Sequence, residues 1–166
     1  MMTAAAVSFE QLVQRHRREI LAYLVRLLGN VHDAEDICQD VLLRAFRAFD
    51  PGILNSNARA WLYRIATNAA LNALKRRRRT ASREVSLAVA PQIPASAHDF
   101  EQRERLQRVG LAVNRLPPRQ RAALMQRRFQ NLSYEEIAVS LNCSATTARA
   151  HVYQAIKKLR QAVYSR

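Results

Sequence analysis

The sequence predicts an all-α protein, and three observations lead to that prediction. Only 3 of the 166 residues are Gly and 5 are Pro, too few for the turns of a β-sandwich or barrel. Apolar residues make up 49% of the chain, which is enough to fill real cores. They recur at three- and four-residue steps, and no segment alternates as a half-buried strand does.

Three helices are expected in the first half of the chain. The first carries its apolar stripe over residues 9–28 and ends at Gly29, a residue type that favours a helix C-terminus. Asp33 is expected to cap the second helix, whose inner stripe consists of Ile37, Val41, Ala45, Phe46 and Phe49. The third is expected over residues 58–79, with Trp61 on its apolar side.

Four helices are expected in the second half, over residues 100–115, 118–129, 133–140 and 144–163. Ser133 and Glu136 form a capping-box pattern, and Ser144 is expected to cap the last helix. Only the tight turn 141–143 separates the last two helices. A short capped helix, a tight turn and a longer basic helix are typical of a helix-turn-helix, although an ordinary helical hairpin is the alternative.

The charge of the chain indicates a polyanionic partner. With 27 Lys and Arg against 13 Asp and Glu the formal balance is +14, which favours nucleic acid first and an anionic membrane surface second. The balance is +6 over residues 1–79, −1 over 80–99 and +9 over 100–166. The middle segment is rich in Ala, Ser and Pro, so we expect two small helical domains, 1–79 and 100–166, joined by the flexible linker 80–99.

Several functional classes are not expected. No apolar run approaches the roughly 20 residues of a membrane span, no secretory signal is visible, and two cysteines make no disulfide framework. We therefore expect a cytoplasmic protein without direct membrane contact. The histidines and cysteines show no metal-ligand spacing, and no catalytic motif is present. No metal, cofactor, catalytic residue or enzymatic activity is expected.

The helix-turn-helix supplies one set of candidate DNA-binding residues. Its second helix would enter the major groove, where Arg149 could donate two hydrogen bonds to guanine. Neighbouring side chains on that helix suit phosphate or base contacts, and residues flanking the first helix suit phosphate contacts. The candidates are Arg127, Tyr134, Thr146, Thr147, Arg149 and Tyr153.

The third expected helix supplies a second set. It ends in a run of five basic residues, 75–79, which alone could be a solvated tail. The same exposed face carries amide side chains, and arginines with amides suit a nucleic-acid surface. The candidates are Arg64, Asn68, Asn72, Lys75, Arg76 and Arg77. Trp61 and Tyr63 are alternatives for stacking on bases.

An acidic cluster interrupts this basic chain. Asp33, Glu35, Asp36 and Asp40 put four of the 13 acids into eight residues. The helix dipole favours acids in the first turn, but it does not account for Asp40, which lies further along the helix. An acidic patch would repel DNA, so this face is expected to meet a basic protein surface. The candidates are Glu35, Asp36, Gln39 and Asp40.

At these residues the sequence resembles the extracytoplasmic-function (ECF) sigma factors of bacterial RNA polymerase. The stretch DAEDICQDVLLRAF is similar to the family's polymerase-binding segment, and AWLYRIATNAALNALKRRRR to its promoter −10 segment. The family's −35-binding region 4 is similar to the stretch LPPRQRAALMQRRFQNLSYEEIAVSLNCSATTARAHVYQAIKKLR. The three motifs occur in the family's order, and the linker lies where the family has one.

The resemblance implies a role for each candidate set. The acidic residues would bind the β′ clamp helices of core RNA polymerase, with the β subunit as a further contact. Asn68 and Asn72 would read single-stranded DNA at −10, and the segment 50–57 would help to hold a flipped base. Arg149 would read double-stranded DNA at −35, with Arg127 on the backbone. An anti-sigma factor is a further implied partner.

The sequence departs from the family pattern in its last helix and at the start of its third helix. Ala150 and His151 replace a usual Ser and Arg, and Ala58 replaces a frequent aromatic residue. The −35 sequence therefore does not transfer from other members. The alternative function is a stand-alone helix-turn-helix transcriptional regulator that does not bind core polymerase.

Overall fold

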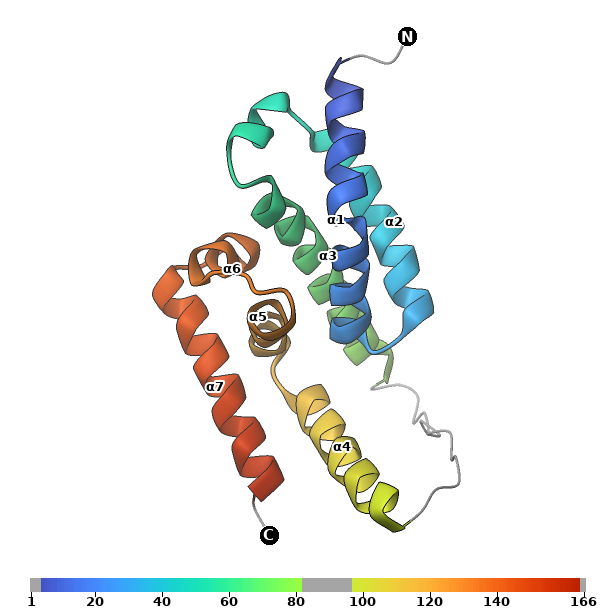
Figure 1. The fold of residues 1–166 in the computed structure, drawn as a ribbon, viewed down its shortest axis with the longest axis vertical. Helices are drawn as coiled ribbons and strands as arrows, with labels where there is room; N and C mark the ends of the chain where they lie inside the picture. Colours follow the sequence, from blue (N-terminus) through green and yellow to red (C-terminus); the bar gives the residue numbers. More distant parts are fainter. Residues whose placement is uncertain (1–3, 82–96, 165–166) are drawn as a thin grey trace.

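The computed structural model describes residues 4–81 and 97–164, and these residues form helices without strands (Figure 1). The all-α prediction is confirmed. The helices are α1 (Ala4–Leu28), α2 (Val31–Ala48), the short 3₁₀ helix η1 (Pro51–Asn55), α3 (Ala58–Ala81), α4 (Ala97–Arg115), α5 (Pro118–Phe129), α6 (Tyr134–Leu141) and α7 (Ala145–Tyr164).

The turn between α1 and α2 differs in one detail from the sequence prediction. Gly29 ends α1 with a positive φ of 71°, as expected for a glycine after a helix. The N-cap of α2 is Asn30, whose side-chain oxygen accepts a hydrogen bond from the backbone N–H of Asp33 at 3.1 Å. Asp33 is therefore not the cap. It lies in the first turn, where its charge still favours the positive end of the helix dipole.

Helices α1, α2, η1 and α3 form an N-terminal lobe. Its core contains the fully buried side chains of Leu24, Val41 and Leu62. Phe46 was expected in the inner stripe of α2, but 57% of it is exposed, and its ring meets only the edge of the core at Phe9, 5.4 Å between centroids. Tyr63 is fully buried, so it cannot stack on bases in this conformation.

Helices α4 to α7 form a C-terminal lobe. The capping box at the start of α6 is confirmed, because Ser133 accepts from the Glu136 N–H and Glu136 accepts from the Ser133 N–H. Asn142 ends α6 in the left-handed conformation with φ 52°, which Asn tolerates better than most residues. Ser144 accepts from the Thr147 N–H at 3.1 Å and so caps α7. Helices α6 and α7 thus form the expected helix-turn-helix.

The two lobes pack against each other in this structure. Helix α3 lies against α6, and α1 lies against α5 (Figure 1). Apolar side chains of both lobes, Leu62 and Ile137 among them, belong to one continuous buried core. The linker prediction covers residues 80–99, most of which lie outside the described residues.

A cluster of buried polar side chains lies at the centre of the contact between the lobes. Nε2 of Gln126, on α5, lies 2.9 Å from the Tyr23 hydroxyl, 2.9 Å from Thr67 Oγ1 and 2.7 Å from Ser140 Oγ. Thr67 and Ser140 share a further hydrogen bond of 2.9 Å. All four side chains are fully buried. Burial raises the pKa of Tyr23 to about 12, so its hydroxyl remains protonated and can donate.

Charged side chains make further hydrogen bonds at the boundary between the lobes. Arg59 on α3 donates from Nη2 to Glu19 Oε2 at 2.7 Å and to the Gln130 carbonyl of the other lobe at 2.6 Å. Asn57 donates to Glu136 Oε1 across the same boundary at 3.0 Å. Burial alone would raise the pKa of Glu19, but the hydrogen bonds from Arg59 and His16 outweigh it and lower the pKa.

Replacing Gln126 by Ala should destabilise the protein. The substitution leaves buried hydroxyls of both lobes without their shared partner, and an unsatisfied buried polar group costs about 1–3 kcal/mol. We expect the free energy of unfolding, measured in urea, to fall by about 2 kcal/mol. Gln154→Ala, at an exposed position of α7, should change it by less than about 0.5 kcal/mol. Equal effects of the two substitutions would contradict a role for the cluster in stability.

The Glu19–Arg59 contact should make stability depend on pH in the acidic range. Because the pKa of Glu19 in the folded protein lies below its ordinary value of 4.5, the unfolded chain takes up this proton first as the pH falls. The contribution is therefore complete above about pH 4.5 and is lost as the pH falls through the folded-state pKa.

Glu19→Gln tests this dependence by urea unfolding at about pH 7 and about pH 3.5. We expect E19Q to lose less stability than the wild type between the two conditions. Glu10→Gln, at an exposed position of the same helix, should lose as much as the wild type. If E19Q and the wild type lose equal amounts, the Glu19–Arg59 contact does not stabilise the fold.

Candidate polymerase and nucleic-acid interfaces

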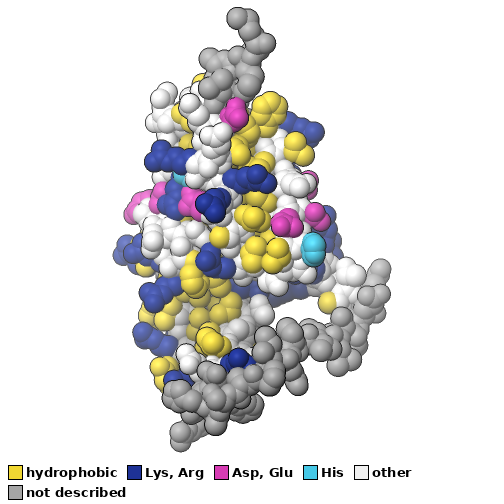
Figure 2. Space-filling model, turned by 45° about the vertical axis from the view of Figure 1, so that its right-hand side comes forward, with side chains coloured by type: hydrophobic (Ala, Val, Ile, Leu, Met, Phe, Trp, Pro, Cys, Tyr) yellow, Lys and Arg dark blue, Asp and Glu magenta, His cyan; other side chains and the backbone are white. Residues whose placement is uncertain are grey.

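The candidate acidic residues form a patch on the outer side of α2. Glu35, Asp36, Gln39 and Asp40 are all exposed. Among the described residues neither Asp36 nor Asp40 has an ion pair, and Glu35 meets only His32, at 4.0 Å. Asp33 is the exception in the acidic cluster, because Arg77 pairs with it. On the face drawn in Figure 2, acidic side chains gather in small groups while Lys and Arg are spread more widely.

The candidate residues of α3 lie on its solvent-facing side, away from α6. Arg64, Asn68, Asn72, Lys75 and Arg76 are exposed. Arg77 is held within the N-terminal lobe: its Nη1 donates to the Leu28 carbonyl at 3.0 Å, and its Nη2 pairs with Asp33. The guanidinium of Arg77 is therefore less available to DNA than those of its neighbours.

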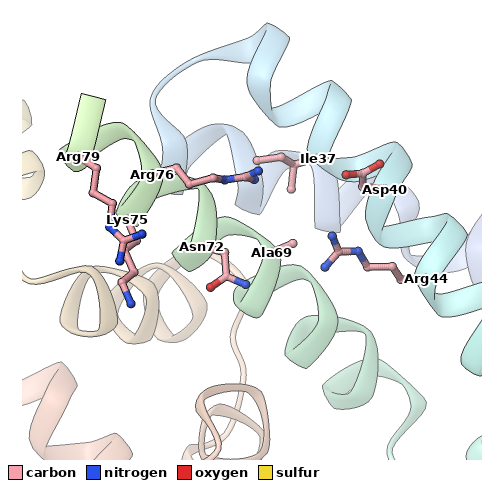
Figure 3. A pocket seen from close by; sticks show the side chains of 8 residues that line it. All are labelled: Ile37, Asp40, Arg44, Ala69, Asn72, Lys75, Arg76 and Arg79. Carbon is pink, nitrogen blue, oxygen red and sulfur yellow. The ribbon is translucent and has the colours of Figure 1, made fainter. Parts of the chain in front are cut away.

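A groove of about 370 Å³ brings the acidic patch and the basic face together (Figure 3). Asp40 and Arg44 line it from α2, and Asn72 and Lys75 line it from α3. Arg76 extends across the α3 side toward α2. Sequence reasoning missed Arg44, although its position four residues after Asp40 places both on one face of the helix.

The candidate residues of the helix-turn-helix lie on three helices: Arg127 on α5, Tyr134 at the start of α6, and the others along the first half of α7. Thr146, Thr147, Arg149 and Tyr153 are exposed. The guanidinium carbon of Arg149 lies 4.8 Å from the Tyr134 ring centroid, and that of Arg127 lies at the same distance from the same ring. Such cation–π contacts restrict both arginines before any ligand binds.

Two details limit which of these side chains remain free. Thr147 Oγ1 lies 2.8 Å from Ser144 Oγ, so this hydroxyl is part of the helix cap. Arg127 also donates to the Leu132 carbonyl at 3.0 Å.

Burial, with a smaller contribution from Arg119, lowers the pKa of His151, which favours its neutral form at pH 7.

Two family models match the chain. The model for Sigma-70 region 2 covers residues 12–80, and the model for Sigma-70 region 4 covers residues 106–159. The matches identify a two-region protein of the sigma-70 type, with the acidic patch and the α3 face in the first region and the helix-turn-helix in the second.

Curated relatives place the chain more narrowly. It is 31% identical to the RNA polymerase sigma-H factor of Pseudomonas aeruginosa, over 94% of this chain and 86% of that protein. It is 33% identical to the ECF RNA polymerase sigma factor SigE of Mycolicibacterium smegmatis and 33% identical to SigG of Mycobacterium tuberculosis. The chain spans 62% of the length of SigE and 47% of that of SigG. It belongs to the family of ECF RNA polymerase sigma factors.

Solved structures agree with this assignment. The sigma factor RpoE from Bartonella quintana, in complex with the anti-sigma factor NepR, matches with a TM-score of 0.68 and 26% identity, over 94% of this chain and 96% of that chain. CnrH in complex with the cytosolic domain of CnrY matches with a TM-score of 0.63 and 27% identity, over 95% and 88%. The family prediction is confirmed. Among the described residues, no helix is both long and apolar enough to cross a membrane.

Proposed function

We propose that this protein binds core RNA polymerase and directs transcription to promoters with particular −10 and −35 elements. The N-terminal domain, residues 1–79, would bind the polymerase and the −10 element, and residues 100–166 would bind the −35 element, with 80–99 as the linker. The observation that carries the proposal is an acidic patch on α2 of a chain whose formal charge is +14; two of its carboxylates, Asp36 and Asp40, have no ion pair with any described residue.

The acidic patch supplies the contact with polymerase. Asp36 and Asp40 are exposed and lack an ion pair within the described ranges, so they can meet a basic protein surface without first losing a partner of their own. With Glu35 and Gln39 they would bind the β′ clamp helices, and the β subunit would extend the contact. The groove at Asp40 places this interface next to Asn72.

The α3 face supplies contacts with the single-stranded −10 element. Asn68 and Asn72 expose amides that can pair with base edges, and Lys75 and Arg76 follow them along the same helix toward its C-terminus. The segment 50–57, which contains η1, would hold a base that leaves the stack. Opening a base step costs a few kcal/mol, which the polymerase complex would supply.

The lobes must separate for both elements to be read together. Positions −10 and −35 are about 25 base pairs apart, or roughly 85 Å at 3.4 Å per base pair. In the structure the lobes are packed together, an arrangement that we call closed. It places α3 directly against α6, the first helix of the helix-turn-helix. The closed structure is therefore a form that opens before or during promoter binding.

The chain would act without chemistry of its own. Members of the sigma-70 family in general direct an enzyme rather than act as one; here the nucleotidyl transfer would belong to the polymerase, in the cytoplasm. The sigma factor RpoE from Bartonella quintana was solved in complex with an anti-sigma factor, and an inhibitor of that kind is a further proposed partner. The alternative, a stand-alone regulator, gives no role to the acidic patch.

Charge reversal on α2 tests the proposal. With core RNA polymerase and a pool of genomic fragments, the wild type should give discrete run-off transcripts and bind core enzyme. D36R/D40R should abolish both because two carboxylates that face the basic partner become cations. E10R/E104R makes the same change of charge at exposed positions outside the patch and should retain both activities.

The contrary result is equally specific. If the wild type binds a palindromic DNA site as a dimer and ignores core polymerase, the protein is a stand-alone regulator. If D36R/D40R binds core enzyme as well as E10R/E104R does, the acidic patch is not the polymerase interface.

Arg149→Ala tests the reading of the −35 element. A guanidinium that donates two hydrogen bonds to guanine contributes about 1–3 kcal/mol of discrimination between bases. R149A should therefore lose affinity for the preferred −35 duplex. For duplexes in which another base replaces the guanine, R149A and the wild type should have equal affinity. Arg160→Ala, at an exposed position near the end of α7, should keep the discrimination. An equal loss for every DNA sequence would show that Arg149 contacts phosphate only.

A further inference from the structure

A second cavity lies where the two lobes meet, at the C-terminal ends of α1 and α3 and the start of α5. Its volume is about 350 Å³, and both lobes line it. Leu74, Leu116 and Pro118 form an apolar part of the wall, whereas Arg77, Arg78 and Arg121 form a basic part. None of the roles proposed above uses this cavity.

Arg121 is the most unusual residue of this cavity. Only 7% of it is exposed, although it is a cation. Among the described residues its guanidinium makes one hydrogen bond, from Nη1 to Asn114 Oδ1 at 3.0 Å, and its buried Nε has no partner. No described carboxylate pairs with it. Burial lowers the pKa of Arg121, and the charges of Arg78 and Arg77 lower it further, so the site disfavours the cation that it holds.

The α3 side of the cavity adds further positive charge. Arg77 is compensated, because it binds Asp33 and the Leu28 carbonyl. Arg78 is exposed and has no ion pair with any residue that the structure describes. Closure therefore places the uncompensated charges of Arg78 and Arg121, one from each lobe, at the same cavity. Their repulsion opposes the packing that brings them together.

We propose that this cavity binds a small phosphorylated molecule, held by Arg78 of one lobe and Arg121 of the other, and that binding holds the lobes closed. Guanidinium groups bind phosphate oxygens with paired, charge-assisted hydrogen bonds. The volume lies in the range of small-molecule sites, and the apolar wall suits the non-phosphate part of such a ligand. Binding to the closed form alone would shift the equilibrium away from the open form.

The test is calorimetric titration of the full chain with inorganic pyrophosphate and, separately, with adenosine triphosphate. Pyrophosphate should bind, and its affinity should fall about tenfold or more in Arg78→Gln and in Arg121→Gln. Arg105→Gln removes the same charge from an exposed position of α4 and should leave the affinity unchanged. Since Arg78 is exposed, R78Q tests the site even if R121Q fails to fold. Tighter binding of adenosine triphosphate than of pyrophosphate would indicate that the apolar wall also contacts the ligand.

A further variant tests whether the site needs both lobes. Thr67→Lys puts a long cation into the buried contact between α3 and α6 and should separate the lobes without removing any of the three arginines. We expect T67K to retain its helical circular dichroism and to lose pyrophosphate binding. Undiminished binding by T67K would overturn the link to closure.

Two results would overturn the site itself. Equal pyrophosphate affinity in R78Q, R121Q and R105Q would mean diffuse attraction to a basic chain. Binding of a DNA duplex through Arg78 and Arg121, without binding of pyrophosphate, would assign these residues to the promoter contact. The consequence for transcription depends on the proposed sigma-factor function, but the titration contains no polymerase. Failure of one proposal therefore leaves the other unaffected.

Discussion

A buried amide links the two lobes at the centre of their contact. Gln126 joins hydroxyl groups from α1, α3 and α6, so helices from both lobes share its hydrogen bonds. Its own Oε1 accepts no hydrogen bond from any residue that the structure describes. A polar centre of this kind specifies one alignment of the lobes, yet it stabilises them less than an apolar contact of equal area would, because its groups are also well solvated when the lobes separate.

This balance explains how one chain can be both compact and able to open. The apolar part of the interface favours closure, while the unpartnered Oε1 of Gln126 and the buried cation of Arg121 oppose it. The acidic patch, the exposed amides of α3 and Arg149 stay exposed in the closed form, whereas Asn57 of the segment 50–57 binds Glu136 of the other lobe. Closure therefore limits the distance between the exposed surfaces rather than covering them, and a partner that favours one form by a few kcal/mol would shift the population.

Local features of the fold could be predicted from the sequence, and features that depend on distant segments could not. Periodicity predicted every α-helix, and the capping residues Ser133 and Ser144 act on neighbours within three positions. The predicted N-cap of α2 was wrong because Asn30 and Asp33 are both suitable residue types for this position. Only the backbone conformation shows that Asn30 lies outside the helix. Gln126 and Thr67 resemble surface residues by type; they are buried because the other lobe covers them.

The candidate sites show the same division for charge. Exposure of Asp36, Asn72 and Arg149 agrees with their positions opposite the apolar stripes. Within the basic run 75–79, however, the sequence treats neighbouring arginines alike, and the fold does not. Arg77 binds the end of α1 and Asp33, whereas Arg78, at the boundary between the lobes, has no ion pair with a described residue. Adjacent positions on a helix differ by about 100° in direction. Neighbouring arginines of one run therefore face an acidic side chain of the same chain, a cavity or solvent. The different surroundings give each arginine a different role.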